Sequence, residues 1–198
     1  YLKMNPFAKI KMVKNMQTKP DFLNELELKR VIDNINNQTI KNIALTAYYT
    51  GCRLNEVLSL KVKNIDLQEK TITVGDSEFM TKSKKQRIIP ICDKLLVMLG
   101  EQLSEKLGSN SFVFGKTDNV KFNPDYISKT FKMALRRADL RESLHFHSLR
   151  HSFGSTLGQK GVPMITVKEL MGHSSITTTQ IYSHTTLNDM RRAINNFN

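Results

Sequence analysis

The sequence has few of the features that mark secreted, membrane-spanning or metal-dependent proteins. It contains two cysteines in 198 residues, Cys52 and Cys92, and they form no C-x-x-C pair. Two isolated cysteines cannot build a disulfide framework or a cysteine-rich zinc site, so we expect a reducing, cytoplasmic environment. No uninterrupted apolar run is long enough to span a bilayer. The histidines form no H-E-x-x-H motif and few acids lie near them, which argues against a metallonuclease and predicts neither metal nor cofactor.

Acidic residues are scarce relative to basic ones. Thirty lysines and arginines against eighteen acidic residues give a formal net charge of +12. A basic surface of this size favours nucleic acid as the partner, since a membrane surface would require a basic amphipathic helix and none stands out. Residues 1–20 contain five lysines and no acid, interrupted by Pro6 and Pro20. We interpret them as a basic linker or strap, the alternative being a disordered tail.

The spacing of apolar residues predicts a single, mainly helical α+β domain over residues 21–198. Helices are expected over residues 24–35, 39–49, 93–107, 147–161 and 188–196. Further helices are expected to begin at residues 54, 123 and 163. Segments 71–74 and 86–91 are rich in β-branched residues, and with a strand near 63–66 they would form a small antiparallel sheet of about three strands. A further short buried strand is expected at 112–115.

Polar motifs gather in the C-terminal part of the chain. His147 and Arg150 stand in an H-x-x-R motif, so on a helix they share one face. Another face of this helix carries apolar residues at four-residue spacing and suits burial; these are Leu149, Phe153 and Leu157. His173 follows Gly172 just after an expected helix end, and Tyr182 comes nine residues later.

Two further motifs lie upstream. Gly51, in Thr50-Gly51-Cys52-Arg53, suits the position just after a helix end and would form a tight turn that holds Arg53. Glu56 lies one turn after Arg53, so a purely structural salt bridge is the alternative reading of that arginine. Lys82 stands in a lysine-rich run between the two expected strands, where it would lie on a hairpin.

Taken in order, these motifs resemble the catalytic domain of the tyrosine recombinase (phage integrase) family. That family shows a T-G-x-R turn, a hairpin lysine, H-x-x-R, L-G-H, and a tyrosine nine residues after that histidine; here Met171 replaces the leucine. The resemblance covers roughly residues 21–184. It implies a site-specific recombinase that cuts and rejoins double-stranded DNA without metal or ATP. It also implies a separate N-terminal DNA-binding domain, absent from this chain, to which residues 1–20 would connect.

The resemblance assigns roles to six catalytic residues: Arg53, Lys82, His147, Arg150, His173 and Tyr182. Tyr182 would be the nucleophile that forms a 3′-phosphotyrosine, and His147 the candidate base, since a phenol of pKa about 10 needs one. The two arginines would bind the phosphate oxygens through planar guanidinium groups, and His173 would donate a hydrogen bond.

The leaving 5′ oxygen requires a proton, and Lys82 is the predicted acid. Lys84 and Lys85 lie in the same run and are the alternatives. Family members act as tetramers on two DNA sites, whereas a free fragment could remain monomeric.

Several functional alternatives remain open at this point. Singly, each histidine or tyrosine could be structural: His147 could cap its helix, His173 could satisfy a turn, and Tyr182 could lie at a core edge. The whole chain could be a catalytically silent DNA-binding module of the same fold, or a type IB topoisomerase with the same chemistry. The preferred reading is a recombinase or integrase of a mobile element.

Overall fold

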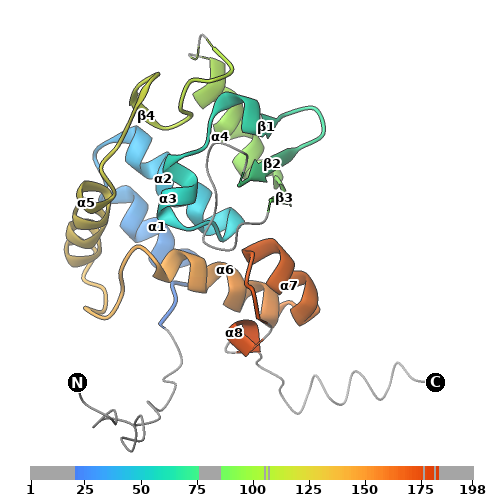
Figure 1. Cartoon of the computed structure of the whole chain (residues 1–198). Helices are drawn as coiled ribbons and strands as arrows, with labels where there is room; N and C mark the ends of the chain where they lie inside the picture. Colours follow the sequence, from blue (N-terminus) through green and yellow to red (C-terminus); the bar gives the residue numbers. More distant parts are fainter. Residues whose placement is uncertain are drawn as a thin grey trace, which may run out of the picture.

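The computed structural model describes residues 21–75, 86–104, 106, 108–175, 177–180 and 182 (Figure 1). Three predicted features therefore lie outside the described residues: the basic segment 1–20, the lysine run that includes Lys82, Lys84 and Lys85, and the helix over 188–196.

The described chain is mainly helical with small antiparallel sheets, and the predicted α+β class is confirmed. The helices are α1 (Glu25–Asp33), α2 (Gln38–Thr50), α3 (Leu54–Leu58), α4 (Asp93–Ser104), α5 (Pro124–Arg137), α6 (Ser148–Gln159), α7 (Met164–Met171) and α8 (Thr177–Gln180), with a 3₁₀ turn η1 (Val62–Asn64). Their starts follow local chemistry. At α1 the Asn24 side chain accepts from the Glu27 amide at 2.9 Å, while the Glu27 carboxylate accepts from the Asn24 amide at 2.9 Å. This reciprocal cap satisfies two otherwise unpaired donors.

The predicted three-stranded sheet is present. Strands β1 (Ile65–Asp66), β2 (Thr71–Val74) and β3 (Arg87–Pro90) pair antiparallel in the order β1-β2-β3, with Ile72 opposite Ile89. Both of these isoleucines are buried. Strand β3 also packs against α7, which brings the sheet to the C-terminal helices (Figure 1).

A second, two-stranded sheet was not predicted. It consists of β4 (Gly115–Thr117) and β5 (Val120–Lys121). In the segment expected as a strand at 112–115, Phe112 forms an isolated bridge with Lys61, Val113 and Phe114 lie in a buried turn, and the strand begins only at Gly115. The exposed residues of β4 and β5 carry no alternating apolar pattern, so periodicity gave no sign of this hairpin.

Helices α2 and α6 form the centre of the molecule, and they pack side by side. Leu149 of α6 is fully buried in the main core. Phe153 and Leu157, on the same predicted face, instead pack against a smaller cluster that contains Tyr182. Helix α6 thus joins the main core to the segment that carries the predicted nucleophile.

Gly51 provides a close contact between α2 and α6, and we expect it to tolerate no side chain. Its φ is +66°, and a Cβ atom there would lie 2.5 Å from Phe153 Cδ1. The left-handed backbone alone costs a non-glycine residue about 1–2 kcal/mol, and the clash adds to this. Gly51→Ala should therefore lower the free energy of unfolding by at least that amount in urea titrations.

Gly100→Ala is the matched control for this substitution. Gly100 lies inside α4, and a Cβ atom there meets nothing within 4 Å. Because alanine favours a helix interior over glycine by about 0.5–1 kcal/mol, this variant should be unchanged or more stable. Equal losses in the two variants would contradict the proposed packing role of Gly51.

Candidate active site

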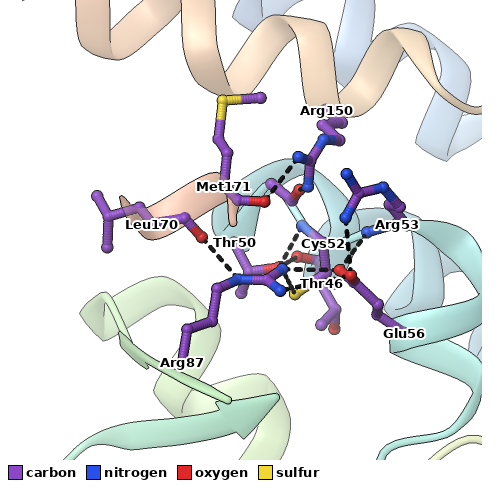
Figure 2. A network of polar contacts seen from close by, with 10 residues as sticks. Thr46, Thr50, Cys52, Arg53, Glu56, Arg87, Arg150, Leu170 and Met171 are labelled. Atoms are coloured by element: carbon purple, nitrogen blue, oxygen red, sulfur yellow. Dashed lines mark hydrogen bonds and ion pairs between the residues drawn. The ribbon is translucent and has the colours of Figure 1, made fainter. Parts of the chain in front are cut away.

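A buried carboxylate, Glu56 on α3, holds two arginines from different elements (Figure 2). Arg53 donates to it from its backbone amide at 2.9 Å and from Nη1 at 3.0 Å. Arg87 of β3 donates from Nη2 at 2.7 Å. Only 3% of the Glu56 side chain is exposed, against 29% for Arg53. The structural salt bridge of Arg53 is therefore present, and part of the Arg53 side chain remains exposed to solvent.

Arg87 also ties the sheet to the end of α7. Its Nε donates to the Leu170 carbonyl at 2.9 Å, and its Nη2 lies 3.7 Å from the Cys52 Sγ. Gly172, with φ of +64°, ends α7, and a Cβ atom there would meet Arg87 Nη1 at 2.9 Å. A glycine at this position lets the arginine pass close to the backbone. The turn that presents His173 is thereby fixed against β3.

Arg150 of α6 is buried, and its guanidinium connects the turn at Gly51 with the turn at Met171. Its Nη1 donates to the Gly51 carbonyl at 2.5 Å and its Nη2 to the Met171 carbonyl at 2.6 Å (Figure 2). Only 2% of Arg150 is exposed. Burial, followed by the nearby charge of Arg53, lowers the pKa of Arg150 to about 10, so the guanidinium remains charged at neutral pH.

The two predicted histidines lie at the ends of helices. His147 occupies the N-cap position of α6 and is exposed, but its side chain makes no capping hydrogen bond. The Nδ1 atom of His173 lies 2.9 Å from the Thr179 hydroxyl. Desolvation and neighbouring positive groups, including Arg150 and Arg53, lower the pKa of each imidazole to about 4. Both rings are neutral at physiological pH.

Tyr182 is almost fully buried, with 1% of its surface exposed, beside these groups. Its ring lies parallel to that of His173, with centroids 6.4 Å apart, and its hydroxyl lies 2.7 Å from His151 Nδ1. Burial raises the pKa of Tyr182 to about 12, although the charge of Arg150 opposes the shift. The phenol is therefore protonated at neutral pH.

His151 was missed as a site residue by the sequence analysis. The signal was present, because His151 follows His147 by four residues and therefore lies one turn further along the same face of α6. Their ring centroids are 4.8 Å apart in an edge-on arrangement. The H-x-x-R motif consists of His147 to Arg150, and His151, the residue that contacts the phenol, comes directly after it.

Five of the six predicted site residues lie on α6 or close to it. They are Arg53, His147, Arg150, His173 and Tyr182, whereas Lys82 lies outside the described residues. Their catalytic roles stay predictions.

Open space lies on both sides of this group. A cleft of about 650 Å³ is lined by Arg87, Lys168 and His173, and one of about 250 Å³ by His147 and Arg150. Over the described residues, no group of three or more His, Cys, Asp or Glu side chains could hold a metal ion.

This α+β domain presents arginines and neutral imidazoles around a phenol, which defines a site suited to a phosphate diester. The phage integrase family model matches residues 21–188, and the chain belongs to this family. The resemblance seen in the order of the motifs is confirmed.

None of the helices described here has the length and apolarity needed to cross a bilayer.

Similar proteins include several tyrosine recombinases. One from Thermosipho africanus is 31% identical over 183 residues, which cover 91% of this chain and 62% of that protein. The tyrosine recombinase XerA of Pyrococcus furiosus is 30% identical over 187 residues, covering 92% and 63%. The chain thus spans less than two thirds of the length of these relatives.

Solved structures agree with this assignment. The chain aligns with a crystal structure of XerA recombinase at a TM-score of 0.71 and 26% identity, covering 92% of this chain and 66% of that one. The catalytic domain of bacteriophage HP1 integrase aligns at 0.65 and 26% identity, covering 89% and 94%. The Tn1549 transposon integrase, solved with a circular intermediate DNA, shares the fold at 0.80 with 18% identity, covering 98% and 72%.

We expect Glu56 to stabilise the fold as well as the site. Glu56→Ala leaves the nearly buried Arg87 guanidinium without its partner carboxylate, and breaking a buried pair in this way costs about 3–5 kcal/mol. Urea unfolding should report a loss of this size. Glu142→Ala is the control, because Glu142 pairs with Lys132 and Arg136 at the surface and should change stability far less. Similar losses in both variants would refute the special role of Glu56.

The Glu56 contribution should also depend on pH. Burial alone would raise the pKa of Glu56, but hydrogen bonds and charges from Arg87 and Arg53 lower it below the usual value of 4.5. A depressed folded-state pKa stabilises the protein above the unfolded value, and this stability is lost as pH falls through the folded value. The difference in unfolding free energy between the wild type and Glu56→Gln should be constant from pH 7 to about 5 and shrink below about 4.5. A difference that grew on acidification would contradict the assigned shift.

Proposed function

We propose that this chain cleaves and rejoins DNA strands, as a site-specific recombinase or integrase, through a 3′-phosphotyrosine formed by Tyr182. One observation carries the proposal: the buried Tyr182 phenol packs on His173 and lies close enough to Arg150 for that charge to act on its pKa, although these residues come from separate segments of the chain. Membership of the phage integrase family supports the same reading.

Arg53 and Arg150 are proposed to bind the non-bridging oxygens of the scissile phosphate. A guanidinium has five N–H donors, so Arg53 can keep its bonds to Glu56 and still offer others to a ligand. Charge on the phosphate increases in the pentacoordinate transition state, where fixed cations bind it most strongly.

His173 can contribute a hydrogen bond without carrying charge. When its Nδ1 accepts from the Thr179 hydroxyl, the remaining proton of the neutral ring lies on Nε2, where it can be donated to a phosphate oxygen. This tautomer of His173 is part of the proposal, because the Thr179 hydroxyl can donate as well as accept.

The proposed reaction exchanges one phosphate ester for another. The Tyr182 oxygen forms a bond to phosphorus, the bond to the 5′ oxygen breaks, and Lys82 protonates that oxygen, with Lys84 and Lys85 as alternatives. The phosphotyrosine retains the ester linkage, so attack by a 5′ hydroxyl reverses the reaction without ATP or metal.

The proposed partner is double-stranded DNA, bound by a homotetramer on two sites. The net charge of +12 supports a polyanionic partner. A similar solved structure, 26% identical to this chain, is that of XerH site-specific recombinase bound to palindromic difH substrate. Similarity to the integrase of bacteriophage HP1 supports the mobile-element proposal, and the chain is as similar in sequence to XerA recombinase.

Tyr182→Phe should abolish covalent attachment to DNA. The test uses a nicked duplex that carries inverted half-sites taken from DNA flanking the gene, on which cleavage releases a short strand and traps the protein. The wild type and the control Tyr126→Phe, whose tyrosine is exposed on α5, should form a denaturant-resistant complex. A covalent complex with Tyr182→Phe would rule out this nucleophile.

The same preparation separates the alternatives. A silent DNA-binding module would bind the duplex and form no complex even as wild type. A type IB topoisomerase would relax a supercoiled plasmid that lacks the half-sites, whereas a site-specific recombinase should leave such a plasmid unchanged.

A further inference from the structure

The hydroxyl of Tyr182 contacts a histidine outside the predicted set. His151 Nδ1 lies 2.7 Å from this hydroxyl, and the two ring centroids are 5.9 Å apart. His147, the base expected from the sequence, makes no hydrogen bond to Tyr182 in the part of the chain that the structure describes. The ring of His147 contacts the ring of His151 instead.

We propose that His151 is a catalytic residue, which accepts the phenolic proton of Tyr182 as the phenol oxygen attacks phosphorus. This inference rests on the proposed strand-cleavage function. A general base must lie within about 2.6–3.2 Å of the group it deprotonates, and His151 meets this requirement before any DNA is bound.

The fold holds the phenol against His151 by close backbone contacts. A Cβ atom at Gly154 would lie 2.8 Å from the Tyr182 ring, and one at Gly158 would overlap the Tyr182 carbonyl oxygen. These two glycines of α6 therefore allow the tyrosine to approach the helix closely. On its other side the ring stacks on His173, whose Nδ1 is already engaged by Thr179. Of the two histidines that contact Tyr182 here, His151 is the one whose ring nitrogen lies within hydrogen-bonding distance of the Tyr182 hydroxyl.

Before the reaction both groups are in the protonation states that the transfer requires. Burial, then the charges of His145 and Arg150, lowers the pKa of His151 to about 4, so its ring is neutral and Nδ1 can accept a proton. Tyr182, with a pKa of about 12, does not ionise unaided at neutral pH. In the step, the phenol O–H bond breaks and its proton moves to Nδ1 as the oxygen–phosphorus bond forms. The 5′ oxygen leaves with the electron pair of the broken bond and takes a proton from the general acid.

The test isolates proton removal from leaving-group protonation. His151→Gln retains a group that can hydrogen-bond the phenol but cannot act as a base. It is compared with His147→Gln and with the control His145→Gln, on nicked duplexes with a normal or a 5′-bridging sulfur phosphate. A sulfur leaving group needs no acid, so the rate on that substrate reports nucleophile activation.

We expect His151→Gln to cleave both substrates about 100-fold or more slowly than the wild type, and His145→Gln, which removes only one of the groups that lower the pKa of His151, to lose far less. Added imidazole should partly restore cleavage by His151→Ala and should not restore Tyr182→Phe. This rescue is not expected if His151 has only a structural role. Urea unfolding and DNA binding of each variant identify losses that arise from misfolding.

Two results would overturn the inference. One is a His151→Gln variant within about threefold of wild type on the sulfur substrate; the other is His147→Gln showing the large loss in its place, with no imidazole rescue of His151→Ala. In both cases the wild type still forms the covalent complex, so the proposed function stands. A wild type that forms no complex on either substrate defeats both the function and this inference.

Discussion

The site depends on one buried negative charge among several positive ones. Glu56 accepts hydrogen bonds from Arg53 and Arg87, and Arg150 lies close enough for its pKa to respond to the same charges. Three guanidinium groups without a carboxylate would repel one another in a poorly solvated space. Because Arg87 also bonds the end of α7, the ion pair joins α3, β3 and α7 in one arrangement. A substrate phosphate would then bind at a positively charged site. Glu56 already offsets the repulsion between the arginines of this site.

The turns that present the functional groups are fixed by a second buried charge. Gly51 and Gly172 both end helices in the left-handed conformation, and Arg150 donates to the carbonyls of Gly51 and Met171. One side chain therefore sets the distance between the turn that carries Arg53 and the turn that carries His173. This explains why motifs more than a hundred residues apart can share a site. Each lies at a helix end, and α6 is the element that both helix ends contact through Arg150.

Local chemistry made most of the helices and the positions of the motifs predictable. The cap at Asn24 and the glycine at Gly51 mark helix ends through interactions within a few residues. Contacts between distant segments left no such mark. The pairing of Glu56 with Arg87 spans 31 residues, and the contact of His151 with the phenol spans the same number. Periodicity also missed β4 and β5, because this hairpin has no buried face.

For Arg53, a structural role and a functional role are compatible. The sequence offered a salt bridge to Glu56 as the alternative to phosphate binding, and the structure contains that salt bridge. Yet an unpaired arginine on a short turn would sample many rotamers and lose entropy when it bound a ligand. Glu56 holds the guanidinium through Nη1 while 29% of the side chain stays exposed. In the proposed reaction the salt bridge would orient Arg53 before the phosphate binds, so that less entropy is lost on binding.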